Sequence, residues 1–249
     1  MRKSSLRPPC NRWLYFLIPL AIGLGADLWT KFAVFRTLAF PAGLYDGRVR
    51  WVVDDVFGFQ LSLNPGALFG LGGGMAPVFA GISLLAVGGV VWWLFIAGAA
   101  KSKLLTVLLG LVTAGILGNF YDRIGLHGIV KWAFSDGTWG YGIAGMTPAG
   151  GGETPALVVR DWILVMIGSY HWPNFNLADC YLVCGVVLLF GASLFKPQIL
   201  GMEHTVGGER SETGEERAKR VEGVEGAEGV ETPKRTGDVG PSDGHTKPS

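Results

Sequence analysis

Two aspartates bracket residues 158–179, which read VVRDWILVMIGSYHWPNFNLAD. Asp161 lies directly before the apolar run 162–167, and Asp179 opens an apolar run that continues through Leu194. We therefore expect both carboxylates at the edge of a membrane. A carboxylate held against lipid loses the hydration that favours its charged form, and two neighbouring carboxylates cannot both ionise at low cost. Aspartic proteases are built around such a pair.

The composition indicates an integral membrane protein. Of the 249 residues, 49% are hydrophobic and nine are Trp, and the mean hydropathy of +0.35 is too high for an ordinary soluble domain. The net charge of +1 and the crowding of charges at the two ends give no support for nucleic-acid binding. The three cysteines form no CxxC pair, so we expect no disulfide framework, metal site or cofactor, and we interpret Cys180 and Cys184 as small buried apolar residues.

Four apolar runs are long enough, at about 20 residues, to cross a membrane as helices. They are residues 13–35, 76–100, 104–120 and 177–195. Basic residues set the predicted orientation, because the first twelve residues and the link with Lys101 and Lys103 are the basic flanks that stay in the cytoplasm. Both termini are therefore expected in the cytoplasm.

The predicted fold is an all-α membrane protein, with a basic cytoplasmic N-terminus (1–12) and a four-helix domain (13–196). Within that domain, the alternating sequence WVVDDVFGFQLSL predicts short strands in a small extracytoplasmic β-rich region, 41–74. Residues 126–155 are rich in Gly and are interpreted as an external insertion, partly ordered at best. The polar composition of residues 197–249 predicts a disordered cytoplasmic tail.

Several polar residues lie at the ends of the predicted helices. Asp27 and Lys31 have the i, i+4 spacing of a pair on one helix face, and either a buried pair or a surface-anchoring pair fits the sequence. Asn64 precedes a Pro-Gly turn, where its amide could hold an extended peptide by the backbone. Asp122 and Arg123 are expected to neutralise one another or nearby partners.

Five short segments resemble the conserved boxes of lipoprotein signal peptidase, also called signal peptidase II, a family of bacterial four-helix membrane aspartic proteases. In chain order they are DLWTK from Asp27, NPGALFG from Asn64, GNFYDR from Gly118, VVRDW from Val158 and FNLAD from Phe175. The resemblance covers residues 13–196, and its most specific segments are GNFYDR and FNLAD.

The resemblance implies that Asp161 and Asp179 form the catalytic pair, with a separation of 179 − 161 = 18 residues that is similar to the family's. The insertion 126–155 departs from the family pattern, which has only a few residues there. An alignment that ignored it would place residues 129–132 in the fourth box and find no aspartate, whereas residues 159–162 restore it.

The resemblance also implies a reaction and a location. Water activated between the two aspartates would cut the signal peptide from a diacylglyceryl-modified prolipoprotein, just before the lipidated cysteine, without metal or cofactor. The enzyme would be a multi-pass monomer of the bacterial inner membrane, with membrane lipids around it and the site near the extracytoplasmic face. The supporting or substrate-binding residues implied are Asp27, Lys31, Asn64, Gly66, Asn119, Asp122, Arg123, Asn176 and Ala178.

Other interpretations stay open from the sequence. A proton-coupled carrier would need ionisable residues near helix centres and repeated halves, and neither is evident. A structural assembly protein would use the polar residues only to hold helices together. Within the protease hypothesis, Asp122 with Asp179 is the alternative pair. Serine catalysis is disfavoured because Ser62, Ser135 and Ser169 have no recognisable His or Lys partner, and His127 and His171 are expected at the surface.

Overall fold

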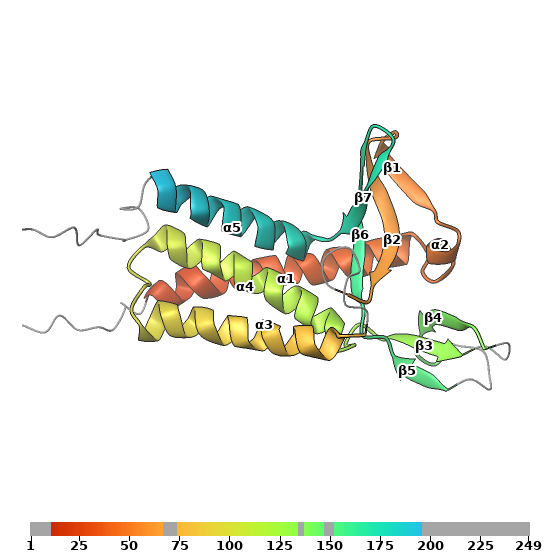
Figure 1. The fold of residues 1–249 in the computed structure, drawn as a ribbon, viewed down its shortest axis with the longest axis horizontal. Coiled ribbons are helices and arrows are strands. Elements are labelled where there is room, and N and C mark those ends of the chain that lie inside the picture. The colour runs from red at the N-terminus through yellow and green to blue at the C-terminus, as the bar shows by residue number, and fades with distance from the viewer. Residues whose placement is uncertain (1–10, 67–73, 134–136, 147–151, 196–249) are drawn as a thin grey trace, which may run out of the picture. The chain divides into compact units, whose positions relative to one another are not determined.

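The computed structural model describes residues 11–66, 74–133, 137–146 and 152–195 (Figure 1). Four helical stretches in this part are long and apolar enough to cross a membrane. They are α1 (Asn11–Thr37), α3 (Ala76–Val91) continued by the π-helical turn η2 (Trp92–Ile96), α4 (Lys103–Arg123) and α5 (Leu177–Phe195). The four predicted helices are thus confirmed. The predicted tail, 197–249, lies outside the described residues, as does nearly all of the basic N-terminus.

Helix α4 is the centre of the bundle. It contacts α1, α3 and α5, and 61% of its most apolar window is buried, against 11–17% in the other three helices. Glycines let the neighbouring backbones approach it closely, since Gly110 faces the carbonyl oxygen of Phe16 on α1 and Gly115 faces that of Ala178 on α5. Small residues at helix contacts are typical of membrane bundles, where close packing has to replace the hydrophobic effect.

The predicted all-α class is wrong, because the chain also forms two antiparallel sheets. The larger has the order β1-β2-β6-β7. Its strands are β1 (Val49–Val53), β2 (Phe57–Asn64), β6 (Val159–Ile167) and β7 (Tyr170–Phe175), and a short helix, α2 (Ala42–Tyr45), precedes β1. Strands β1 and β2 confirm the strands predicted within 41–74. Strand β6 is buried without interruption from Val159 to Leu164, which explains why its sequence shows no alternation.

The second sheet lies in the Gly-rich insertion and has the order β4-β3-β5. Its strands are β3 (Ile129–Ala133), β4 (Trp139–Ile143) and β5 (Glu153–Pro155). The interpretation of 126–155 as an external insertion, partly ordered at best, stays a prediction, although its described part forms these three strands. In β4 large residues alternate with glycine. The glycines made the segment look like a loop and hid the two-residue alternation that is typical of a strand. The hydroxyl of Tyr45 joins this sheet to α2, since it accepts a hydrogen bond from the backbone N–H of Tyr141 (2.6 Å) and donates to the Tyr141 carbonyl (3.2 Å).

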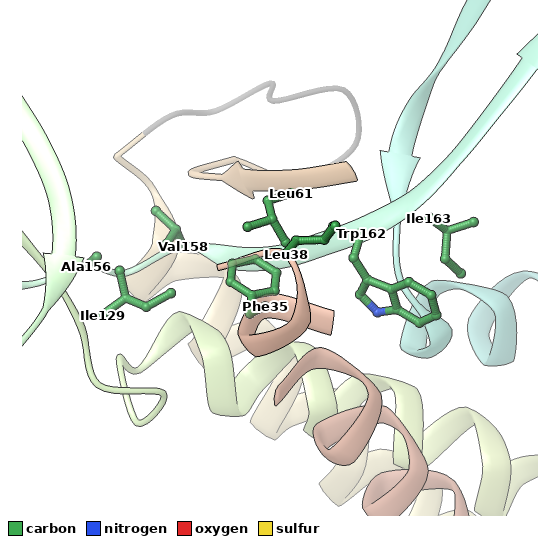
Figure 2. Close-up of a cluster of buried hydrophobic side chains, with 8 residues drawn as sticks. All are labelled: Phe35, Leu38, Leu61, Ile129, Ala156, Val158, Trp162 and Ile163. Carbon is green, nitrogen blue, oxygen red and sulfur yellow. The ribbon is translucent and has the colours of Figure 1, made fainter. Parts of the chain in front are cut away.

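One hydrophobic cluster holds both sheets against the end of α1 (Figure 2). Phe35 lies in the last turn of α1 and Leu38 directly follows that helix. Leu61 comes from β2, and Ile129 comes from β3. The remaining buried members are Ala156, Val158, Trp162 and Ile163. The segment that leads into β6 and the two β6 residues that follow Asp161 lie within this cluster, so the position of Asp161 depends on how well the cluster is packed.

Gly115 offers a test of the packing of α4 against α5. In Gly115→Ala the new Cβ would lie 2.5 Å from the Ala178 carbonyl oxygen, so the two helices would have to separate. We expect the free energy of unfolding to fall by about 1 to 3 kcal/mol, despite the better helix propensity of alanine. Gly81→Ala on α3 is the matched control, because nothing lies within 4 Å of its new Cβ. Thermal unfolding in detergent should separate the variants, and equal midpoints would contradict this packing.

Candidate active site

A cavity of about 590 Å³ is lined by residues of the larger sheet and of helices α3, α4 and α5. Asp161 of β6 and Asp179 of α5, the two aspartates paired by the sequence analysis, both line it. Its other polar side chains include Asn64, Asn119 and Arg123. Part of the wall is apolar and follows α4 and α5 into the membrane-spanning region. The cavity therefore combines two carboxylates with an apolar surface.

The start of α5 fixes the position of Asp179. The backbone N–H of Asp179 donates to Asn176 Oδ1 (3.1 Å), and the backbone N–H of Asn176 donates to Asp179 Oδ2 (3.1 Å). This reciprocal pair is a capping box with aspartate in place of the usual glutamate. The Asp179 carboxylate thus lies in the first turn of α5, a position where acidic side chains are favoured.

Asp161 is buried and accepts two side-chain amides. Asn176 Nδ2 donates to Asp161 Oδ1 (2.7 Å), and Asn64 Nδ2 donates to Asp161 Oδ2 (3.2 Å). Asn64 is itself oriented by the turn that follows it, because the Gly66 N–H donates to Asn64 Oδ1 (3.0 Å). Burial, and then the charge of Asp179, raise the pKa of Asp161 to about 7, although the two amides and Lys31 act in the opposite direction.

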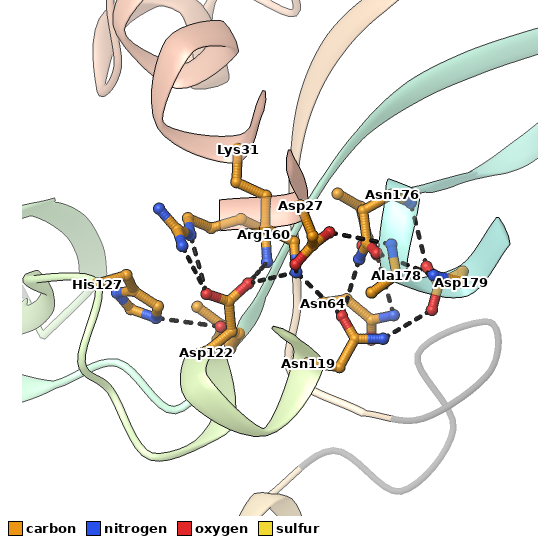
Figure 3. Close-up of polar contacts among 12 residues, drawn as sticks. Asp27, Lys31, Asn64, Asn119, Asp122, His127, Arg160, Asn176, Ala178 and Asp179 are labelled. Atoms are coloured by element: carbon orange, nitrogen blue, oxygen red, sulfur yellow. Dashed lines mark hydrogen bonds and ion pairs between the residues drawn. The ribbon is translucent and has the colours of Figure 1, made fainter. Parts of the chain in front are cut away.

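Asn176 connects the two carboxylates. Its side-chain amide donates to Asp161, and its backbone N–H donates to Asp179. Asn119 of α4 adds a second contact to the pair, since its Nδ2 donates to Asp179 Oδ1 (2.8 Å) (Figure 3). The Asn119 side chain is oriented in turn by two donors to its Oδ1, Lys31 Nζ and Asn176 Nδ2, each at 3.1 Å. Both asparagines thus present N–H groups to the aspartates.

Behind these amides lies a buried cluster of charges (Figure 3). Lys31 Nζ is 2.8 Å from Asp27 Oδ2 and 3.1 Å from Asp122 Oδ2, and all three side chains have no exposed surface. The predicted pairing of Asp27 with Lys31 is confirmed, and the surface-anchoring alternative is wrong. Asp27 also accepts the backbone N–H of Ala178 (2.9 Å), so it ties α1 to the start of α5.

Asp122 and Arg123 point in different directions. Asp122 pairs with Lys31 and with Arg160, whose Nη2 lies 2.7 Å from Asp122 Oδ1, so Asp122 is neutralised by nearby partners as expected. It is absent from the residues that line the cavity, which disfavours Asp122 with Asp179 as the alternative pair. Arg123 lines the cavity, and its guanidinium lies over the Phe79 ring, 5.5 Å from the centroid.

Three expectations about smaller features need correction. Cys180 is half-buried and Cys184 is exposed, and both line the cavity, although Cys180 also packs against the hydrophobic cluster around Phe35. His127 is half-buried, and burial lowers the pKa of its ring. The ring contacts the Val158 carbonyl oxygen (3.1 Å) and accepts the Ile129 N–H (3.0 Å). His171 is exposed, as predicted. In the described part of the chain no group of three or more His, Cys, Asp or Glu residues could hold a metal ion.

The sequence analysis did not select Arg160 as a site residue. The sequence did contain evidence for its role, because Arg160 lies among apolar residues in a segment that has the composition of a buried strand. A buried arginine requires an acidic partner or several hydrogen bonds. Looking for that partner would have connected Arg160 with an aspartate of the preceding helix.

The sequence of this chain is similar to those of known membrane enzymes. A family model described as signal peptidase (SPase) II matches residues 20–195, which include every site residue named above. A lipoprotein signal peptidase of Rhodopirellula baltica is 42% identical over 183 residues, covering 73% of this chain and 72% of that protein. Another, from Francisella tularensis subsp. mediasiatica, is 33% identical over 197 residues, covering 77% of this chain and 96% of that protein.

Two solved structures of bacterial membrane enzymes have similar folds, each with a TM-score of 0.52. One is 25% identical and covers 71% of this chain and 85% of its own. The other is 24% identical and covers 73% of this chain and 93% of its own.

Lys31→Met tests the buried charge cluster. The substitution leaves Asp27 without its cation in a buried place, so we expect the free energy of unfolding to fall by about 3 to 5 kcal/mol. Lys101→Met removes an exposed lysine from the link between η2 and α4 and should leave stability nearly unchanged. Thermal unfolding in detergent measures both, and indistinguishable variants would show that the cluster does not stabilise the fold.

Proposed function

This chain belongs to the signal peptidase II family, and from this premise we propose that it is an aspartic endopeptidase that removes the signal peptide from diacylglyceryl-modified prolipoproteins. The family supports a membrane protease of lipoprotein processing. The observation that carries the aspartic mechanism is that one residue, Asn176, hydrogen-bonds both Asp161 and Asp179 in a single cavity. The following steps describe how this pair would act.

Asp179 is the base and Asp161 is the acid in this proposal. The Asp179 carboxylate, at the helix N-terminus, takes a proton from a water molecule, while the protonated Asp161 donates its proton to the scissile carbonyl oxygen. The water oxygen bonds to the carbonyl carbon and gives a tetrahedral intermediate. Asp179 then passes its proton to the leaving nitrogen, the C–N bond breaks, and Asp161 recovers a proton from the intermediate. The raised pKa of Asp161, about 7, supports this assignment, because a large share of its carboxyl groups is still protonated at neutral pH.

The apolar wall of the cavity supports a lipid-modified substrate. Ile116 of α4 and Leu182 and Val183 of α5 continue the surface away from the aspartates along the membrane-spanning helices. A lipidated cysteine rests at the bilayer surface with its acyl chains in the hydrocarbon core, which brings the neighbouring peptide bond to the depth of the aspartates. We propose that the acyl chains lie on this wall. Asn64 and Arg123, at the polar end, would then contact the peptide backbone.

The same proposal includes an orientation. Arg12 Nη2 donates to the Lys101 carbonyl (2.8 Å), so the start of α1 and the link before α4 meet at one end of the bundle. Basic residues at that end favour the cytoplasmic side, and the aspartates lie toward the opposite ends of α1 and α4. We propose a monomeric multi-pass protein of the inner membrane, with a cytoplasmic N-terminus (1–12), a protease domain (13–196) and a cytoplasmic tail (197–249).

Cleavage of a diacylglyceryl-modified prolipoprotein in membranes tests the pair. Asp161→Asn and Asp179→Asn should each reduce kcat by at least about 1,000-fold, because each removes a proton carrier. Asp55→Asn is the matched control, since Asp55 is exposed in the β1–β2 turn and asparagine tolerates its φ of 56°. Asp161→Asn with normal cleavage would remove Asp161 from the mechanism. An unaltered chain that cleaves nothing would favour a carrier or an assembly protein.

The pH dependence of kcat/KM tests the assignment of acid and base. Asp161 acts in its protonated form, so activity is present below its pKa and is lost as the pH rises through that value, about 7. Above it, kcat/KM should fall about tenfold for each pH unit. The Asp55→Asn control should have the same profile. An activity that stays undiminished at alkaline pH would contradict a protonated Asp161.

A further inference from the structure

We propose that Arg160 is a positioning residue. Its hydrogen bonds to Asp122 set the register of β6, and this register directs the Asp161 side chain into the cavity. This inference rests on the proposed function, because it concerns the geometry of the aspartate pair. Arg160 does not line the cavity and would act through Asp161.

Arg160 donates three hydrogen bonds to the Asp122 carboxylate (Figure 3). Its Nε and Nη2 donate to Asp122 Oδ1 at 3.0 and 2.7 Å, and its backbone N–H donates to Asp122 Oδ2 at 3.0 Å. The arginine is 6% exposed and the aspartate is fully buried. Contacts from both the side chain and the backbone of one residue fix where the strand lies and how it is rotated about its own axis.

The side chains of Arg160 and Asp161 point to opposite faces of β6, as neighbouring strand residues must. Arg160 reaches Asp122 on α4, and Asp161 faces the cavity. A slip of β6 by one residue would exchange the two faces, placing a guanidinium in the cavity and a carboxylate against Asp122. Two aspartates in contact in a buried place would be strongly unfavourable, so the Arg160–Asp122 pair selects the register that leaves Asp161 in the cavity.

The sheet alone does not fix this register. Strand β2 pairs Phe59 with Ile163 but Ser62 with Asp161, so the register shifts by one residue between these two pairs. The pairing that leads up to Asp161 is therefore separated by an irregularity from the rest of the β2–β6 ladder. A β-bulge of this kind re-aims side chains, and something outside the ladder has to choose between the alternatives.

The same helix positions the second aspartate. Asn119 lies one turn before Asp122 on α4 and donates to Asp179. Lys31 contacts both α4 residues, at 3.1 Å from Asn119 Oδ1 and 3.1 Å from Asp122 Oδ2. The distance between the two carboxylates is thus set by one stretch of α4, with Arg160 as its connection to β6.

Stability alone gives a weak reason for this pair, because a buried ion pair is often no more stabilising than apolar residues of similar volume. Its geometric role predicts a distinct effect on the titration of Asp161. The groups that face Asp161 are Asp179 from α5, Arg123 from α4, Lys31 from α1 and the amides of Asn64 and Asn176. If β6 loosens, Asp161 moves away from Asp179 and gains hydration, and both changes lower its pKa.

The experiment compares Arg160→Met and Arg160→Lys with Arg50→Met, which removes an exposed arginine from β1 of the same sheet. Cleavage of a diacylglyceryl-modified prolipoprotein is measured against pH, per folded molecule, with thermal unfolding in parallel. Arg160→Met should lower kcat about 100-fold with little change in KM, and should move the alkaline limb to lower pH by roughly one unit. Arg160→Lys keeps the charge with a single donor group and should show a smaller loss with a shift in the same direction. Arg50→Met should match the unaltered chain.

Several outcomes would overturn the inference. A parent-like alkaline limb in Arg160→Met, with any loss of rate explained by a loss of folded protein, would assign Arg160 to stability alone. If Arg160→Met does not fold, Arg160→Lys tests the inference instead. A rate and a pH dependence like those of the unaltered chain would show that a positive charge at this position is enough and that the hydrogen-bond geometry of the guanidinium is not needed. An unaltered chain that does not cleave would instead refute the proposed function.

Discussion

The buried ammonium of Lys31 is the constraint on which the site depends. A cation without solvent must be surrounded by acceptors, and Lys31 finds three of them, on Asp27, Asp122 and Asn119. Each of these acceptors has a second contact: Asp27 holds the start of α5, Asp122 holds β6, and Asn119 holds Asp179. Pairing one charge therefore brings together two membrane helices, the start of a third and one of the two inner strands of the larger sheet.

Different interactions stabilise the helix bundle and the two sheets. Inside the bundle, close backbone contacts at Gly110 and Gly115 and the buried polar network replace the hydrophobic effect, which lipid removes. Outside it, water drives the apolar cluster around Phe35 and Trp162 to pack both sheets on the end of α1. The aspartates lie where these two regions meet. Asp161 belongs to the sheet and Asp179 to the bundle, so their separation depends on both regions being assembled correctly.

The sequence predicted the helices well because crossing a membrane demands length and apolar character, and both can be counted. The pairing of Asp161 with Asp179 came from family resemblance, and physical reasoning led to the expectation that both carboxylates lie at the edge of a membrane. Periodicity could not reveal β6, because a strand buried on both faces has no alternation. The same limit affects Cys180 and Cys184, since lipid-facing, cavity-lining and core positions of a membrane helix are all apolar. Arg160 was missed because its significance lies in a partner distant in sequence.

The connection from α4 to β6 illustrates how a protein accommodates extra length. Asp122 and Arg160 bind each other directly, so the two ends of this connection stay together whatever lies between them. The entropy of closing a loop grows only with the logarithm of its length, and each doubling adds about 0.6 kcal/mol. A salt bridge across the base thus makes the region that contains β3, β4 and β5 a permissive place for growth, in which a chain can acquire a folded module without disturbing the geometry of the residues beneath it.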